Sequence, residues 1–205
     1  PDYANGVAID SQNNIIVSGI FTDTVDFNGA TLPNVAPTAN TILTSASLGG
    51  SDIFVAKLSS GNGALSWVKR FGGTASETSN AVVLDTNDNI FITGGYGFYG
   101  AAVDFGGGPL PLSGGGQTST QYDVYVAKLK PDATFGTGSW ARGYGGLGGD
   151  QGMAIAVNGG GDVAVVGYFE QTMTMGASMM TSAGGRDAFV AKYAGADGSP
   201  TWSDR

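Results

Sequence analysis

The sequence predicts an all-β protein made of tandem four-stranded antiparallel sheets, and three observations support this fold class. The 205 residues include 36 glycines but only 7 prolines, with the glycines lying between short apolar runs, as is typical of many short strands joined by tight turns. The apolar runs are rich in β-branched residues and are bounded by Asn, Asp, Ser and Gly. One strand-like segment also recurs three times, and we expect no long helices.

The first element of each repeat is a β-hairpin. Two short apolar runs are separated by a polar loop of Asn, Asp, Ser or Gly, which is the pattern of two paired strands. The three copies are Val7–Asp10 with Asn14–Gly19, Val82–Asp85 with Asn89–Gly94, and Ala156–Asn158 with Asp162–Gly167.

The third strand is the recurrent segment itself. It reads DIFVAKL, DVYVAKL and DAFVAKY, beginning at Asp52, Asp123 and Asp187, so the copies start 71 and 64 residues apart. Three such matches indicate an internal structural repeat. In the first copy both faces of the strand are apolar up to Lys57, which predicts a sheet covered on both sides.

A fourth strand ends in tryptophan, at Trp67, Trp140 and Trp202. Four-stranded sheets covered on both faces by their neighbours are typical of propeller blades. We therefore predict a β-propeller with three blades present, at residues 1–79, 80–152 and 153–205. The repeats exceed the roughly 40 to 50 residues of common blades, and the excess lies between the second and third strands. These insertions, of 33, 29 and 20 positions, carry Val25–Gly29 and Val103–Gly107.

The chain resembles the SBBP-type bacterial β-propeller repeat family. The resemblance rests on VAID with NIIVSG, on DIFVAKL, and on LSW followed by FGG, with Val-Asp-Phe-x-Gly in two copies. The third copy departs from the pattern, with Asn158 in place of the hairpin aspartate and Met175 near the expected phenylalanine. The resemblance implies a large secreted or surface-attached bacterial protein and implies no catalytic residues.

Composition excludes several function classes. The net charge is −8, which would repel a polyphosphate backbone, so we expect no nucleic-acid partner. The chain has no cysteine and no histidine, which removes the commonest zinc sites and the usual catalytic triads. We expect no cofactor, and no stretch is long and apolar enough for a membrane span. The chain opens with Pro-Asp-Tyr rather than a leader, so we expect a processed or truncated chain.

Three recurrent features are candidates for a site. Asp85–Asn89 has the spacing of half a calcium loop, but its counterparts Asp10–Asn14 and Asn158–Asp162 weaken that interpretation, and we favour a hairpin turn. The tryptophans could stack against sugars, but we favour packing between sheets. Each recurrent strand also carries a lysine that can bury its stem and reach a carboxylate; these are Lys57, Lys128 and Lys192.

The first functional hypothesis is a non-enzymatic extracellular or cell-surface scaffold or adhesion module, with variable loops that contact a protein or glycan. Because three blades do not close a ring, we expect further blades of a longer chain or self-association. One alternative is a carbohydrate-active propeller enzyme, for which the candidate loop acids are Asp26, Asp104, Glu77 and Glu170. Another is a calcium-stabilised structural propeller. No catalytic, metal or ligand-binding residue is assigned.

Overall fold

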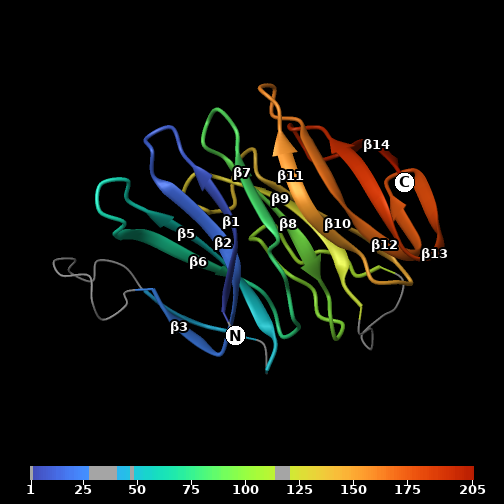
Figure 1. Ribbon diagram of the computed structural model, residues 1–205, viewed down its shortest axis with the longest axis horizontal. Helices are drawn as coiled ribbons and strands as arrows, with labels where there is room; N and C mark the ends of the chain where they lie inside the picture. Colours follow the sequence, from blue (N-terminus) through green and yellow to red (C-terminus); the bar gives the residue numbers. More distant parts are fainter. Residues whose placement is uncertain (1, 28–40, 47–48, 114–120) are drawn as a thin grey trace.

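The computed structural model describes residues 2–27, 41–46, 49–113 and 121–205. Within these residues the protein is all-β and antiparallel, with strands and no helices. Figure 1 shows three sheets stacked face to face along the chain. Residues 28–40, 47–48 and 114–120, which include Gly29 of the first Val-Asp-Phe motif and part of each of the first two insertions, lie outside the described residues.

Each sheet has four strands in the sequence order that the repeat predicts. The first sheet contains β1 (Tyr3–Ile9), β2 (Ile15–Thr22), β5 (Ser51–Leu58) and β6 (Leu65–Phe71). The second contains β7 (Ala81–Leu84), β8 (Ile90–Tyr96), β9 (Asp123–Leu129) and β10 (Trp140–Gly146). The third contains β11 (Gln151–Val157), β12 (Val163–Met175), β13 (Ser178–Tyr193) and β14 (Pro200–Asp204).

The fourth strands differ from the prediction at their ends. The tryptophan does not end the strand: β6 continues to Phe71 and β10 begins at Trp140 and runs to Gly146. The end of β10 pairs with β12 at Gly146 and Met173, which joins the second and third sheets at one corner. A fourth strand therefore also bridges two repeats, which a repeat-by-repeat interpretation of the sequence does not show.

The insertions adopt three different structures. In the first, β3 (Thr24–Asp26) pairs with β4 (Ile42–Thr44) as a separate two-stranded hairpin. In the described part of the second insertion, Asp104 forms an isolated bridge with Pro109 and Phe98 forms another with Ser76. In the third, β12 and β13 simply continue past the sheet as a paired ribbon. Insertion length thus changes local structure while the four-stranded sheet is kept.

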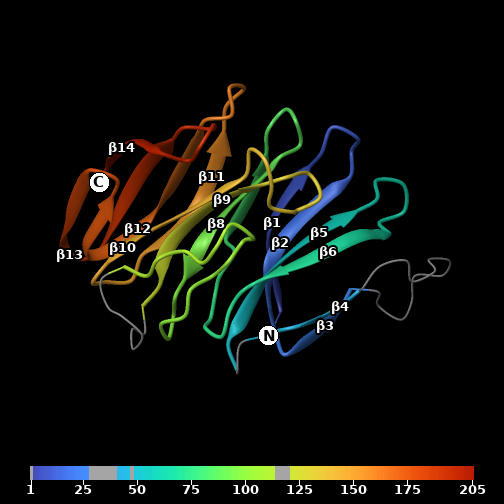
Figure 2. The same ribbon diagram turned by 180° about the vertical axis from the view of Figure 1, so that it is seen from behind.

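The core lies between the sheets. Ile53 and Val55 of the first sheet share one core with Tyr125 of the second. Val126 of the second sheet shares another core with Phe189 of the third. Because side chains alternate between the faces of a strand, the recurrent strand of the second sheet sends one set toward the first sheet and the other toward the third. The first strands of the sheets, β1, β7 and β11, lie side by side along one edge of the stack (Figures 1 and 2).

Candidate functional site

The predicted hairpin loops use their side-chain oxygens to hold the turn. Asp85 Oδ1 accepts hydrogen bonds from the backbone N–H groups of Asn87 (2.9 Å) and Asn89 (3.0 Å), and its Oδ2 accepts from Asn89 Nδ2 (2.8 Å). Asp10 makes the same contacts with Gln12 and Asn14. These are the local bonds by which aspartate favours turns. No group of three or more acids in the described residues is arranged to hold a metal ion.

The recurrent lysines form ion pairs or hydrogen bonds with residues in or near the turns. Lys57 Nζ lies 2.7 Å from Asp10 Oδ2, and Lys192 Nζ lies 3.0 Å from Oδ2 of Asp162, which stands where the first copy has Asn14. Although burial opposes ionisation, Lys57 and the amide donors around it lower the pKa of Asp10 to about 2. Lys128 instead donates to the Gly195 carbonyl oxygen (3.1 Å). These contacts give the lysines a structural role.

The three tryptophans stand in equivalent positions but differ in exposure. Trp140 is 3% exposed, packs against the core between the second and third sheets, and donates from Nε1 to the Gly195 carbonyl oxygen (3.1 Å). Trp67 is half-buried against the first core. Trp202, on the third sheet, is 49% exposed. Packing between sheets therefore describes Trp140, whereas Trp202 has no such cover.

The acids nominated for catalysis lie on separate segments, each with contacts of its own. Asp26 is on β3 beside the first sheet. Asp104 accepts from the backbone N–H groups of Gly106 and Gly108 in the second insertion. Glu170, on β12, pairs with Arg186 at 2.8 Å. Glu77 is buried between the first and second sheets. The structure thus gives Asp104 and Glu170 local structural partners.

A buried pair of acids occurs at each junction between sheets, and the sequence hypotheses do not include these pairs. At the first junction Glu77 lies beside Asp52, and both are fully buried. A Cβ on Gly72 would stand 2.6 Å from Asp52 Cγ and 2.7 Å from Glu77 Oε2, so only glycine leaves room for the two groups. The equivalent pair at the second junction is Asp123 with Asp150. In both copies the acid follows the Gly-Gly pair by the same number of residues. The acid is a glutamate in one copy and an aspartate in the other, so the equivalence is difficult to recognise from the sequence.

Burial sets the charge of these junction acids. Burial raises the pKa of Glu77 to about 9. The hydrogen bond from the Gly73 N–H opposes this increase, and the nearby charge of Asp52 adds to it. It raises the pKa of Asp150 to about 8 and that of Asp123 to about 6. Among the residues that the structure describes, Glu77 Oε1 and Asp150 Oδ2 find no hydrogen-bond partner. Both acids are therefore neutral at pH 7, which suits a place between two packed sheets.

An aromatic cluster in the second insertion is the best candidate for a binding surface. Phe98 stacks on Tyr122 with ring centroids 4.9 Å apart, and it meets the edge of Tyr99 at 4.5 Å. Tyr99 is 65% exposed and has a φ of 70° in a tight turn closed by the Gly100 N–H and the Gly97 carbonyl oxygen. The turn holds the Tyr99 ring toward solvent and against Phe98, which in turn stacks on Tyr122. The sequence directed attention to this insertion but did not single out these rings.

The comparisons with known proteins add no family. A scan against models of protein families matches none of them, and a search of curated proteins finds no match. The described residues also contain no helix with the length and apolarity that a bilayer crossing requires.

Proposed function

We propose that this chain is a non-enzymatic β-propeller-type scaffold of the bacterial cell surface or extracellular space, and that the aromatic cluster Phe98–Tyr99–Tyr122 contacts a glycan or surface protein. The location follows from the repeat resemblance. The propeller is supported by three equivalent sheets stacked face to face with β1, β7 and β11 along one edge. The turn aspartates and strand lysines are already engaged in structural bonds, which supports a scaffold rather than an enzyme.

The observation that carries the binding role is the exposed, preorganised ring of Tyr99. Tyrosine offers a large amphipathic surface with only two side-chain torsions to order, so little conformational entropy is lost on contact. Phe98 packs against this ring, and Tyr122 of the same insertion stacks on Phe98. A ring exposed without such support would lose more freedom on binding.

The test is binding of the wild-type chain and of Tyr99→Ala to one array of immobilised oligosaccharides and surface proteins. We expect the substitution to weaken binding about fivefold or more, since truncating a central aromatic contact costs above about 1 kcal/mol. Tyr3→Ala is the matched control, because Tyr3 is 54% exposed on β1, outside the aromatic cluster. Unchanged binding by Tyr99→Ala would contradict the assigned surface, and oligosaccharide cleavage lost in Asp104→Asn would contradict the scaffold.

A further inference from the structure

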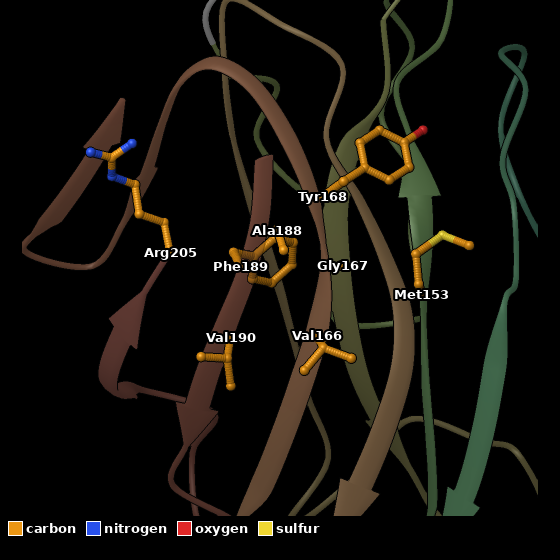
Figure 3. Close-up of a pocket in the computed structure, with 8 residues that line it drawn as sticks. All are labelled: Met153, Val166, Gly167, Tyr168, Ala188, Phe189, Val190 and Arg205. Carbon is orange, nitrogen blue, oxygen red and sulfur yellow. The ribbon is translucent and has the colours of Figure 1, made fainter. Parts of the chain in front are cut away.

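The outer face of the third sheet is apolar and uncovered. We define this face by Met153, Ala154, Val166, Ala188 and Val190. Val166 and Val190 pair across β12 and β13, as Figure 3 shows, and Val166 is 44% exposed. The face holds a hollow of about 450 Å³, lined by Met153, Val166, Gly167, Tyr168, Ala188, Phe189, Val190 and Arg205.

The central positions of the equivalent faces on the other two sheets are buried. When the three copies are aligned on the glycines Gly19, Gly94 and Gly167, Val166 is equivalent to Ser18 and Thr93. Ser18 and Thr93 are both 0% exposed because the next sheet covers them. The recurrent strands likewise align Val190 with Val55 and Val126, which are also 0% exposed. The third sheet thus presents a face that the chain elsewhere always covers.

The contact that covers this face is the same at both junctions. At the first, Val82 of β7 lies over the Gly6–Ser18 pair of the first sheet, with its backbone nitrogen 2.9 Å from a Cβ built on Gly6. The amide Nδ2 of Asn5 donates to the Ser79 carbonyl oxygen (3.0 Å). At the second, Asn80 Nδ2 donates to the Gly152 carbonyl oxygen (2.8 Å). The first strand of one sheet therefore lies over the paired first and second strands of the sheet before it.

The first sheet presents the complementary side of that contact. Val7 is equivalent to Val82 and Ile155, which are 5% and 9% exposed, whereas Val7 itself is 67% exposed. Ile9 beside it is also 67% exposed. On the third sheet the pair equivalent to Gly6–Ser18 is Ala154–Val166. A second hollow of about 140 Å³ lies there, lined by Ala154, Ile155, Ala156, Ala164 and Val166.

The polar groups at the two open faces also match those that meet at the junctions within the chain. Arg205 pairs with Asp187 at 3.5 Å, as Arg70 pairs with Asp52 at 2.6 Å at the first junction, where Glu77 lies beside that pair. On the first sheet Asp2 takes the position of the junction acid. Its Oδ1 accepts the Thr22 N–H (3.1 Å), as Asp150 Oδ1 accepts the Glu170 N–H (3.2 Å).

We propose that the outer face of the third sheet binds the first sheet of a second copy of this chain, head to tail, with Val7 of one copy over Ala154 and Val166 of the other. The occupant follows from the chain itself, since the same two kinds of face already meet twice within it. Asp2 of the second copy then lies beside Arg205 and Asp187. Met153 replaces the junction asparagine and contributes apolar contact in place of a hydrogen bond. The inference rests on the proposed stacked-sheet scaffold and is independent of Tyr99.

Engineered cysteines test the geometry, because the chain has no cysteine of its own. Val7→Cys and Val166→Cys chains are mixed and oxidised mildly, and we expect a disulfide-linked pair of one chain of each kind. Leu147→Cys, 62% exposed in the linker between the second and third sheets, is the matched control and should pair with neither. A wild-type chain that is monomeric by light scattering at its highest soluble concentration would overturn the proposal. Val166→Cys chains that pair only with each other would do the same.

Charge substitutions test the direction of the assembly. Val166→Asp and Val7→Asp should each be monomeric, while an equimolar mixture should form a one-to-one pair, because each variant keeps the face that the other has lost. Because both positions are exposed, we expect both variants to fold. Melting temperatures close to that of the wild-type chain would establish this. If Val7→Asp alone keeps the wild-type mass, the first sheet is not the partner. Persistent Tyr99-dependent binding by a monomeric wild-type chain would reject this inference and leave the proposed function intact.

Discussion

At the scale of single residues, the junction acids show how burial determines charge. Glu77 is ionised in an unfolded chain at neutral pH but neutral between the sheets, because burial raises its pKa to about 9 from an ordinary value of 4.5. The folded state therefore binds more protons than the unfolded state between these two values. The free energy of unfolding contributed by this group is fully present below about pH 4.5 and is lost as the pH rises toward 9. Asp150, with a pKa of about 8, acts in the same direction.

The corresponding prediction concerns Glu77→Gln, which keeps the side chain neutral at every pH. We expect the free energy of unfolding of the wild-type chain to fall from about pH 5 to about pH 9, by at most about 1.4 kcal/mol per pH unit for each acid. The variant should show a shallower fall in urea unfolding over the same range. Glu170→Gln is the control, since Glu170 pairs with Arg186 near solvent. Parallel curves for wild type and Glu77→Gln would contradict the buried neutral acid.

At the scale of elements, the two Val-Asp-Phe insertions pack in the same way against their own sheets. The ring of Phe27 lies 4.9 Å from that of Phe54, and the ring of Phe105 lies 4.9 Å from that of Tyr125. Phe105 also lies 5.4 Å from Phe71 of the preceding sheet and is 2% exposed. The insertion of the second sheet is therefore part of an interface between sheets, whereas Phe27 remains half-buried.

The two phenylalanines should differ in their contribution to stability. Phe105→Ala removes a ring enclosed by two sheets and should cost about 3 to 5 kcal/mol of unfolding free energy. Phe27→Ala removes a ring covered from its own sheet and should cost roughly 1 to 2 kcal/mol. Urea unfolding of both variants beside wild type measures the difference. Equal losses would show that the preceding sheet adds nothing at Phe105.

At the scale of the whole molecule, the middle sheet is the most enclosed. Every residue of β8 is buried, and β9 is buried except at Lys128, because the second sheet has a neighbour on each face. On β13 buried and exposed positions are mixed, as expected for a sheet covered on one face. Local openings need less free energy where one face is already in water.

Hydrogen exchange tests this order of stability. Backbone amides of β8 and β9 should exchange more slowly than those of β13 and β14. The Val166→Asp variant is the sample of choice, so that a bound second copy does not protect the third sheet. Equal protection of the second and third sheets in that variant would contradict the order.

The four strands of each sheet, their order and the hairpin turns could be predicted from the sequence, because they depend on short-range chemistry. The alternation of side chains between the two faces of the strand around Val55 involves only neighbouring residues. The hydrogen bonds of Asp85 within its turn also join residues that are close in sequence. The candidate surface was predictable only as an insertion, since the stacking of Phe98 on Tyr122 joins residues separated by the length of that insertion. Which of several equivalent residues is covered depends on the packing of whole sheets, so Trp140 is buried while Trp202 is exposed. Equivalent residues share a local sequence but not a neighbour, and burial depends on the sheet that packs next to them.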